Sequence, residues 1–213
     1  TPDPLWSRGL GDVYKRQGSE KPQGQILFTD KNKYYYKTLF DENDIRRAIA
    51  RISHEIIESN EGTKNLILLG IKTRGQHIAK RISEAISSYE NTTLNYYPFD
   101  TKFFRDDIKT SNKIKSLNIE ISVQDKNLVL IDDVLFTGRT IRASLEAIFT
   151  LGRPNNIKLA ALIDRGHREV PIRPDFVGKN IPTSNNEHVK VSMKEIDGVD
   201  KIELYKEETH INE

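Results

Sequence analysis

The sequence has no cysteine, and it has only one methionine and one tryptophan in 213 residues. Without cysteine the chain has no disulfide framework, no thiolate metal site and no cysteine nucleophile. Long hydrophobic runs are missing too, because apolar stretches such as 66–70 and 159–163 are far too short to cross a bilayer. No hydrophobic signal core stands near the start. We therefore expect a cytoplasmic protein without a membrane span.

Neither sign of charge dominates, since 33 Lys and Arg oppose 31 Asp and Glu for a net charge of +2. This balance predicts no general attraction to nucleic acid, so any nucleic-acid surface must be a local patch. Two common phosphate-binding motifs are also missing, namely Gly-x-x-x-x-Gly-Lys-Ser/Thr and a strand-linked Gly-x-Gly-x-x-Gly. The length suits one compact domain with an appendage.

Residues 1–36 differ from the rest of the chain. They begin with Thr, carry three prolines and four glycines, and show no sustained helical or strand period. We expect a disordered leader, or one foreign to the gene as an expression or sequence-assembly scar. A short docking peptide is the alternative. The folded domain is predicted to occupy 37–213.

Apolar residues recur at helix and strand spacings from residue 41 onward. Asp41 is a candidate N-cap, and isoleucines at 45, 49, 52 and 56 follow on one helical face. Further helices are predicted around 78–86 and 141–148. Strands are predicted at 66–71, 94–99, 128–131 and 157–163, with later ones near 189–193 and 202–204. This alternation predicts an α/β fold with a mainly parallel twisted sheet flanked by helices. The long polar segment 100–127 is typical of a lid or a disordered loop.

The stretch 128–140 is typical of a sugar-phosphate site. Its apolar strand ends in Asp132 and Asp133, and a small-residue turn around Gly138 then opens a helix. Backbone N–H groups at such a turn cradle a phosphate, and Gly138 permits the φ that the turn often needs. The two carboxylates can hold the hydroxyls of a ribose whose 5-phosphate lies in the turn. An acidic pair before a glycine turn also occurs for structural reasons alone. The interpretation therefore depends on the whole pattern and not on this pair and turn by themselves.

This stretch resembles the phosphoribosyl diphosphate (PRPP) signature of type I phosphoribosyltransferases. Three further segments, in the same order, resemble the PyrR family of bifunctional pyrimidine operon regulators and uracil phosphoribosyltransferases. They are the loop from Gly70 to Gly75, the segment from Phe104 to Asp107 and the block from Asp164 to Ser184. The likeness covers about 39–205 and leaves the leader outside it.

The resemblance implies that uracil and PRPP are converted to UMP and diphosphate with Mg²⁺ as cofactor. The metal would be held mainly by diphosphate and ribose oxygens, and no dedicated protein cage is expected. The resemblance assigns catalytic roles to Arg105, Asp132 and Asp133, with Arg105 in a hood that closes over the substrate. It assigns contacts with PRPP to Lys72, Thr73, Arg74, Asp132, Asp133, Thr137, Gly138, Arg139 and Thr140. A solvated charged loop is the alternative for the segment around Arg105.

Phe136 bears on the choice of base. Purine-using relatives commonly carry an Asp at this place, where it meets the imidazole edge of the base, whereas an apolar ring exchanges no proton. Phe136 therefore favours a pyrimidine, although a core aromatic beneath the loop is an equal alternative. By analogy with the family, base contacts are expected from Asp164, Arg165 and Val177.

RNA binding is the rival function that the resemblance implies. A regulator of this family binds a pyrimidine-operon leader mRNA through a basic face of its dimer when UMP is bound, and we expect a homodimer or a higher homo-oligomer. The expected contacts are Arg51, His54, Arg168 and Lys179. Ala50 and Ser59 depart from the family pattern and remove a hydroxyl and a cation. The alternatives left open are an ordinary hydrogen-bonded role for the histidine and a protein that is mainly an attenuator with weak enzymatic activity.

Overall fold

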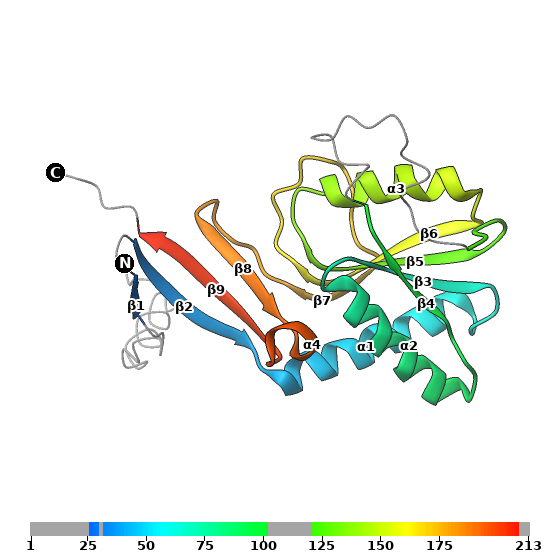
Figure 1. Ribbon diagram of the computed structural model, residues 1–213, viewed down its shortest axis with the longest axis horizontal. Coiled ribbons are helices and arrows are strands. Elements are labelled where there is room, and N and C mark those ends of the chain that lie inside the picture. The colour runs from blue at the N-terminus through cyan, green and yellow to red at the C-terminus, as the bar shows by residue number, and fades with distance from the viewer. Residues whose placement is uncertain (1–25, 30–31, 102–120, 209–213) are drawn as a thin grey trace, which may run out of the picture.

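The computed structural model describes residues 26–29, 32–101 and 121–208. These residues form one parallel and one antiparallel sheet (Figure 1). The parallel sheet, with its helices, makes up the body of the molecule. The antiparallel sheet lies to one side of it.

The parallel sheet has five strands in the order β4-β3-β5-β6-β7. They are β3 (Leu66–Ile71), β4 (Tyr96–Phe99), β5 (Asn127–Leu135), β6 (Asn156–Asp164) and β7 (Phe176–Asn180). Every neighbouring pair is parallel, which confirms the predicted fold class. Strand β7 was not predicted, because its sequence Phe-Val-Gly-Lys-Asn has too few apolar residues to stand out.

Helices cover both faces of this sheet. Helices α1 (Glu42–Asn60) and α2 (Gly75–Glu90) lie on one face, and α3 (Arg139–Leu151) lies on the other (Figure 1). Successive residues of a strand point to opposite faces, so in β5 Ile131 joins the α1–α2 core and Leu130 joins the α3 core. Burial on both faces explains why the central strands are near-continuous apolar runs.

The predicted first helix is confirmed together with its caps. Asp41 accepts a hydrogen bond from the Asp44 N–H at 2.8 Å, and the Asp44 carboxylate accepts one from the Asp41 N–H at 3.2 Å. This reciprocal pair is a capping box that satisfies two N–H groups the helix leaves free. At the other end, Glu61 takes the left-handed conformation with φ 54° and ends the helix.

The antiparallel sheet has the order β1-β2-β9-β8. Strands near 189–193 and 202–204 were predicted, but β1, β2 and the separate sheet were not. Its strands are β1 (Ile26–Thr29), β2 (Asn32–Phe40), β8 (Glu187–Ser192) and β9 (Lys201–Glu208), with the one-turn helix α4 (Lys194–Asp197) between the last two. Val191, Met193 and Ile202 join the α1–α2 core. The loop that carries α4 is thereby anchored against the main body.

The expectation that residues 1–36 lack strands was wrong for 26–29 and 32–36. Strand β2 pairs with β9, with Tyr36 opposite Tyr205. Because its partner lies near the other end of the sequence, a local pattern does not reveal this pairing. Residues 1–25 lie outside the described residues, and the domain boundary after residue 36 stays a prediction. No helix in the described ranges is long and apolar enough to cross a membrane.

Candidate functional site

The predicted site lies at the C-terminal ends of β3 and β5, which are parallel neighbours. After β3 the chain continues into α2 on one face of the sheet, and after β5 it continues into α3 on the other. The direction of winding therefore reverses between these two strands. Such a switch point is where open α/β sheets bind ligands. The loop 72–74 and the turn 136–138 both lie at this edge.

Gly75 joins the two halves of the site. It is buried at the start of α2, where a Cβ would lie 2.5 Å from the carbonyl oxygen of Ile131 and 3.2 Å from the Cα of Asp132. Only a residue without a side chain permits this approach of helix to strand. The loop after β3 is thereby held directly against the acidic end of β5.

The two acidic residues at the end of β5 have different surroundings. Asp132 is 8% exposed, and its Oδ1 accepts a hydrogen bond from the Asp133 N–H at 2.9 Å. Asp133 is half-buried, and its Oδ1 accepts a hydrogen bond from the Val134 N–H at 3.0 Å. Burial, followed by the neighbouring Asp133, raises the pKa of Asp132 well above its usual range. A ligand that donates hydroxyl hydrogen bonds to Asp132 would therefore stabilise its ionised form.

The turn that is predicted to hold a phosphate has the expected glycine conformation and leads into a helix. Gly138 has φ 88° and precedes α3, whose first N–H groups have no partner within the helix. The turn is held by the carbonyl of Thr137, which accepts hydrogen bonds from the Glu169 and Val170 N–H groups at 3.0 and 3.1 Å. Arg139 forms an ion pair with Glu169 at 2.6 Å. Thr140 lies in the first turn of α3.

The loop after β3 carries three of the predicted diphosphate contacts. The Lys72–Thr73 peptide bond is cis, and Lys72 Nζ lies 3.7 Å from the Asp100 carboxylate at the end of β4. Arg74 was predicted to donate to diphosphate. In the structure its Nη2 donates to both carboxylate oxygens of Asp197, at 3.1 and 3.2 Å. Sequence reasoning missed Asp197.

Phe136 is not a core aromatic, so that alternative was wrong. Its ring is 39% exposed, the Arg165 guanidinium lies 3.9 Å from its centroid, and the His167 ring meets it edge-on at 6.0 Å. Arg165 is 6% exposed and donates to Thr183 Oγ1 at 3.1 Å and to the Glu187 carbonyl at 2.7 Å. This stacked pair forms one wall beside the acidic strand end.

The loop after β6 is braced from within by Arg168. Its Nη2 pairs with Asp164 Oδ2 at 2.7 Å, and its Nε donates to the Ile172 carbonyl at 2.9 Å. Its Nη1 donates to the carbonyls of three further residues, Leu135, Phe136 and Gly166. Asp164 Oδ1 also accepts the Gly166 N–H at 3.0 Å. These contacts favour structural roles for Arg168 and Asp164, whose contacts with RNA and base stay predictions without support from this geometry.

Three of the predicted RNA contacts lie on α1 and β7. Arg51 Nη2 donates to the carbonyls of Val177 and Gly178, both at 2.7 Å, so two backbone groups at the expected base contact Val177 already have a partner. His54 stacks on Tyr89 with centroids 4.2 Å apart. Lys179 Nζ lies 5.9 Å from the centroid of Phe40. Both the lysine and the histidine are exposed.

Known proteins place this geometry in a family. Residues 35–196 match the phosphoribosyl transferase domain. The chain is 53% identical over 169 residues to the bifunctional protein PyrR of Clostridioides difficile, covering 78% of this chain and 96% of that protein. It is 51% identical over 170 residues to the bifunctional protein PyrR of Leuconostoc mesenteroides, covering 79% and 97%. The chain belongs to the PyrR family. It is a phosphoribosyltransferase, which confirms the resemblance seen in the sequence.

Solved structures agree on the fold of this PyrR-family chain. The hypoxanthine phosphoribosyltransferase of Trypanosoma cruzi superposes with a TM-score of 0.64 at 20% identity, covering 81% of this chain and 97% of that one. The hypoxanthine phosphoribosyltransferase of Staphylococcus aureus gives a TM-score of 0.60, also at 20% identity, and covers 78% and 90%. At such identity the likeness concerns the fold alone.

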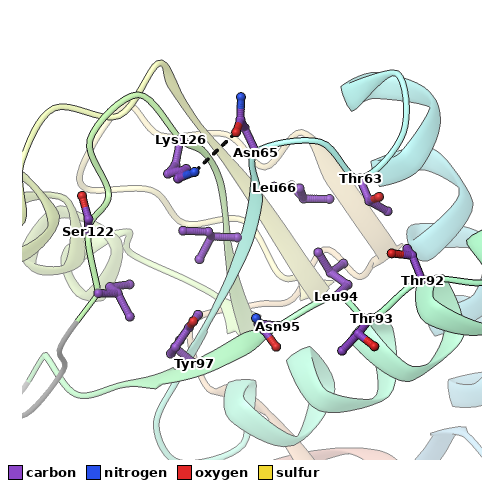
Figure 2. Close-up of a pocket in the computed structure, with 12 residues that line it drawn as sticks. Thr63, Asn65, Leu66, Thr92, Thr93, Leu94, Asn95, Tyr97, Ser122 and Lys126 are labelled. Atoms are coloured by element: carbon purple, nitrogen blue, oxygen red, sulfur yellow. Dashed lines mark hydrogen bonds between the residues drawn. The ribbon is translucent and has the colours of Figure 1, made fainter.

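A polar cavity of about 470 Å³ lies at the opposite edge of the sheet, away from the PyrR signature (Figure 2). Asn65, Leu66 and Lys126 line it at the N-terminal ends of β3 and β5, together with Thr92, Thr93 and Tyr97. None of the predicted site residues lines it. The switch point, with its acidic pair and glycine turn, therefore remains the candidate site.

Arg105 and the centre of the predicted hood lie outside the described residues. Within the described ranges, no group of three or more His, Asp and Glu side chains could hold a metal ion. The acidic pair fits Mg²⁺ that is bound mostly through substrate oxygens, because this ion usually keeps one or two carboxylates beside phosphate and water ligands.

Proposed function

We propose that this PyrR-family chain transfers the phosphoribosyl group of PRPP to uracil and releases diphosphate. The observation that carries this proposal is the acidic pair of β5, held beside the Gly138 turn and against the start of α2 at the switch point. Each part of PRPP then has a matching partner. The 5-phosphate takes the Gly138 turn, the ribose hydroxyls take Asp132 and Asp133, and the diphosphate takes the loop 72–74.

The reaction separates charge along this line. As the bond between the anomeric carbon and diphosphate breaks, positive charge develops on the ribose and negative charge on the leaving group. Lys72, the loop N–H groups and Arg74 lie at the leaving end, whereas the carboxylates lie under the ribose. Mg²⁺ bound to the diphosphate would neutralise part of the leaving charge. By resemblance Arg105 reaches the diphosphate when the hood closes, which would exclude water.

The wall formed by Phe136 and Arg165 supports a pyrimidine as acceptor. An exposed ring offers an apolar surface to a base but no group that exchanges a proton with a purine imidazole. Asp164 and Val177 are proposed as base contacts from the family resemblance alone, because in the structure they already bind Arg168 and Arg51. We propose that the reaction takes place in the cytoplasm.

Purified protein should form UMP from uracil and PRPP and should not form a nucleotide from hypoxanthine. Chromatographic separation of the products measures both reactions. Excess EDTA should abolish turnover, and added Mg²⁺ should restore it, because the diphosphate charge is otherwise not neutralised. Turnover of hypoxanthine with none of uracil would refute the base assignment, and full activity in EDTA would refute the metal.

A second function, UMP-dependent binding of a pyrimidine leader RNA, is supported by the relatives named bifunctional and by the exposed Lys179 near the Arg51 contacts on β7. We propose that a homodimer or higher homo-oligomer presents this face. Sedimentation measures the assembly. If uracil conversion proves weak, attenuation is the main role of the protein.

Lys179→Ala should weaken RNA binding and lower the slope of affinity against salt by about one, since one phosphate contact is lost. A gel shift with the leader RNA of pyrimidine genes, with and without UMP, measures this effect. Lys80→Ala is the matched control, because Lys80 is an exposed lysine of α2 in a weak pair with Glu84 at 3.8 Å. Equal binding by both variants would remove Lys179 from the RNA surface.

A further inference from the structure

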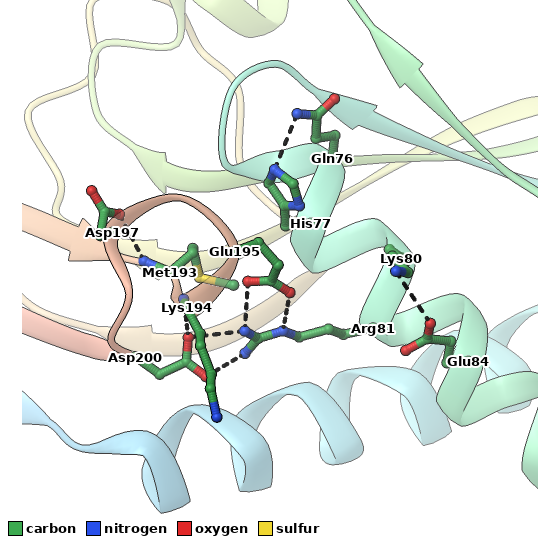
Figure 3. A network of polar contacts seen from close by, with 10 residues as sticks. All are labelled: Gln76, His77, Lys80, Arg81, Glu84, Met193, Lys194, Glu195, Asp197 and Asp200. Atoms are coloured by element: carbon green, nitrogen blue, oxygen red, sulfur yellow. Dashed lines mark hydrogen bonds and ion pairs between the residues drawn. The ribbon is translucent and has the colours of Figure 1, made fainter.

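The loop around α4 presents three carboxylates to helix α2. Glu195 and Asp200 meet Arg81, and Asp197 meets Arg74 at the N-terminal end of the same helix. Figure 3 shows the loop wrapped against α2 with the Arg81 side chain between Glu195 and Asp200. None of these three acids belongs to the PRPP signature. One of them, Asp197, nevertheless contacts Arg74, which is proposed to bind diphosphate.

Arg81 fixes the loop with two bidentate ion pairs, an arrangement that adds geometric specificity as well as energy. Its nitrogens donate to both oxygens of Glu195 at 2.9 and 2.7 Å and to both oxygens of Asp200 at 2.7 and 2.9 Å. The Asp200 side chain is only 5% exposed, and it also accepts the Lys194 N–H at 2.7 Å. Burial opposes ionisation of Asp200, but Arg81 and the backbone donor outweigh it and hold its pKa below the usual range.

Asp197 is oriented by its own turn before it meets Arg74. Its Oδ2 accepts the Met193 N–H at 2.8 Å, and both of its oxygens accept from Arg74 Nη2. This backbone donor, despite some burial, and then Arg74 itself lower the pKa of Asp197, so its carboxylate is ionised at neutral pH. The Arg74 side chain is 30% exposed and that of Asp197 is 23% exposed. Asp197 thus restrains the Arg74 guanidinium through Nη2.

One donor of Arg74 has no partner among the described residues. Its Nε is a buried nitrogen for which the described residues provide no hydrogen-bond acceptor. An unsatisfied buried donor is costly, and an anionic oxygen is the acceptor that satisfies a guanidinium best. Because 30% of the Arg74 side chain stays exposed while Nη2 binds Asp197, an incoming diphosphate can reach this cation.

We propose that Asp197 is a positioning residue that orients Arg74 for the diphosphate of PRPP, and that Arg81 holds the α4 loop so that Asp197 stays in place. This inference rests on the proposed function, because it assigns diphosphate to the loop 72–74. It adds a carboxylate from the antiparallel-sheet side of the molecule to a site otherwise built from the parallel sheet. If Asp197 positions Arg74, removing its charge weakens diphosphate binding. If Asp197 instead competed with diphosphate for Arg74, removing its charge would strengthen that binding.

Asp197→Asn should raise the KM for PRPP about tenfold, the loss expected for one charge-assisted hydrogen bond. The inhibition constant of diphosphate should rise in parallel, whereas the KM for uracil should change less than about twofold, because the base is bound at the other end of the site. In an Arg74→Ala background the same substitution should have no further effect, since the two residues act as a unit. Steady-state kinetics measures these values, and calorimetry with diphosphate and Mg²⁺ measures binding directly.

Glu84→Gln is the matched control, because it removes a carboxylate from the exposed pair with Lys80 on the same helix and should leave both KM values unchanged. Arg81→Lys, which cannot hold two carboxylates bidentately, should raise the KM for PRPP and lower the melting temperature. A lower KM for PRPP in Asp197→Asn, an equal rise in both KM values, or an independent effect in the Arg74→Ala background would each overturn the proposal. Wild-type protein that binds diphosphate without forming UMP would refute only the proposed reaction.

Discussion

Replacing Asp132 by Asn should make the ligand-free protein more stable while removing most of its activity. The carboxyl is buried beside Asp133, and its raised pKa shows that the ionised form is unfavourable in the folded chain. An Asn side chain keeps an oxygen to accept the Asp133 N–H. We expect a gain of about 0.5–2 kcal/mol in the free energy of unfolding, typical for relief of an active-site cost. We expect kcat/KM to fall about 100-fold or more, as when a group that stabilises transition-state charge is lost.

The stability gain should depend on pH with a definite sign. Because the pKa of Asp132 is raised on folding, its contribution to stability is present below the unfolded pKa and is lost as pH rises through the folded pKa. The two proteins should therefore have similar stability in acid, and the Asn variant should become the more stable one as pH increases. Denaturant unfolding at a series of pH values that starts below the ordinary Asp pKa of about 3.9 measures this difference. The wild-type kcat/KM should rise as the carboxylate ionises, because the ionised form binds the ribose hydroxyls.

Asp125→Asn provides a control of the same chemistry at an exposed position in the turn before β5. It should change neither activity nor the pH dependence of stability. If Asp132→Asn proved less stable than wild type at high pH, burial would not be the cost that raises the Asp132 pKa. If it stayed active, Asp132 would not be the ribose ligand.

Local patterns in the sequence predicted the parallel sheet and the acidic strand end. The run before Asp132 is apolar because β5 is buried on both faces, and Gly138 stands where φ is positive. Each of these signals is contained in a stretch of a few neighbouring residues. The helix from Glu42 to Asn60 was predicted for the same reason, since its isoleucine spacing and its Asp41 cap are local.

Other features could not be predicted because they depend on pairs distant in the chain. Strand β2 pairs with β9, and Arg74 pairs with Asp197, although each partner lies far away in the sequence. A charged side chain does not reveal its partner, so Arg168 looked available for RNA although its donors face loop carbonyls. The spacing of the acids Glu195, Asp197 and Asp200 in the short α4 loop was the one signal that could have indicated their role.

Gly75→Ala should disrupt stability and substrate binding together. The added Cβ would lie 2.5 Å from the Ile131 carbonyl oxygen, and this backbone atom belongs to a central strand that cannot easily move. Helix α2 must then shift away from β5, which should cost about 1–3 kcal/mol in the free energy of unfolding. The shift also separates the loop 72–74 from Asp132. Since a displacement of about 1 Å can cost about 100-fold in rate, we expect kcat/KM for PRPP to fall by that order.

Gly62→Ala is a control that adds backbone strain at a position away from the site. Gly62 follows α1 with φ 105° and has open space around it, so Ala there should cost about 1–2 kcal/mol through its backbone alone. Denaturant unfolding should show comparable losses for the two variants, but kinetics should show a defect in PRPP use only for Gly75→Ala. A normal KM for PRPP and a normal kcat in Gly75→Ala would mean that the two halves of the site are not held in register by this contact. A shared kinetic defect would instead trace the loss to instability, because Gly62 precedes β3, at the end of the strand opposite the switch point.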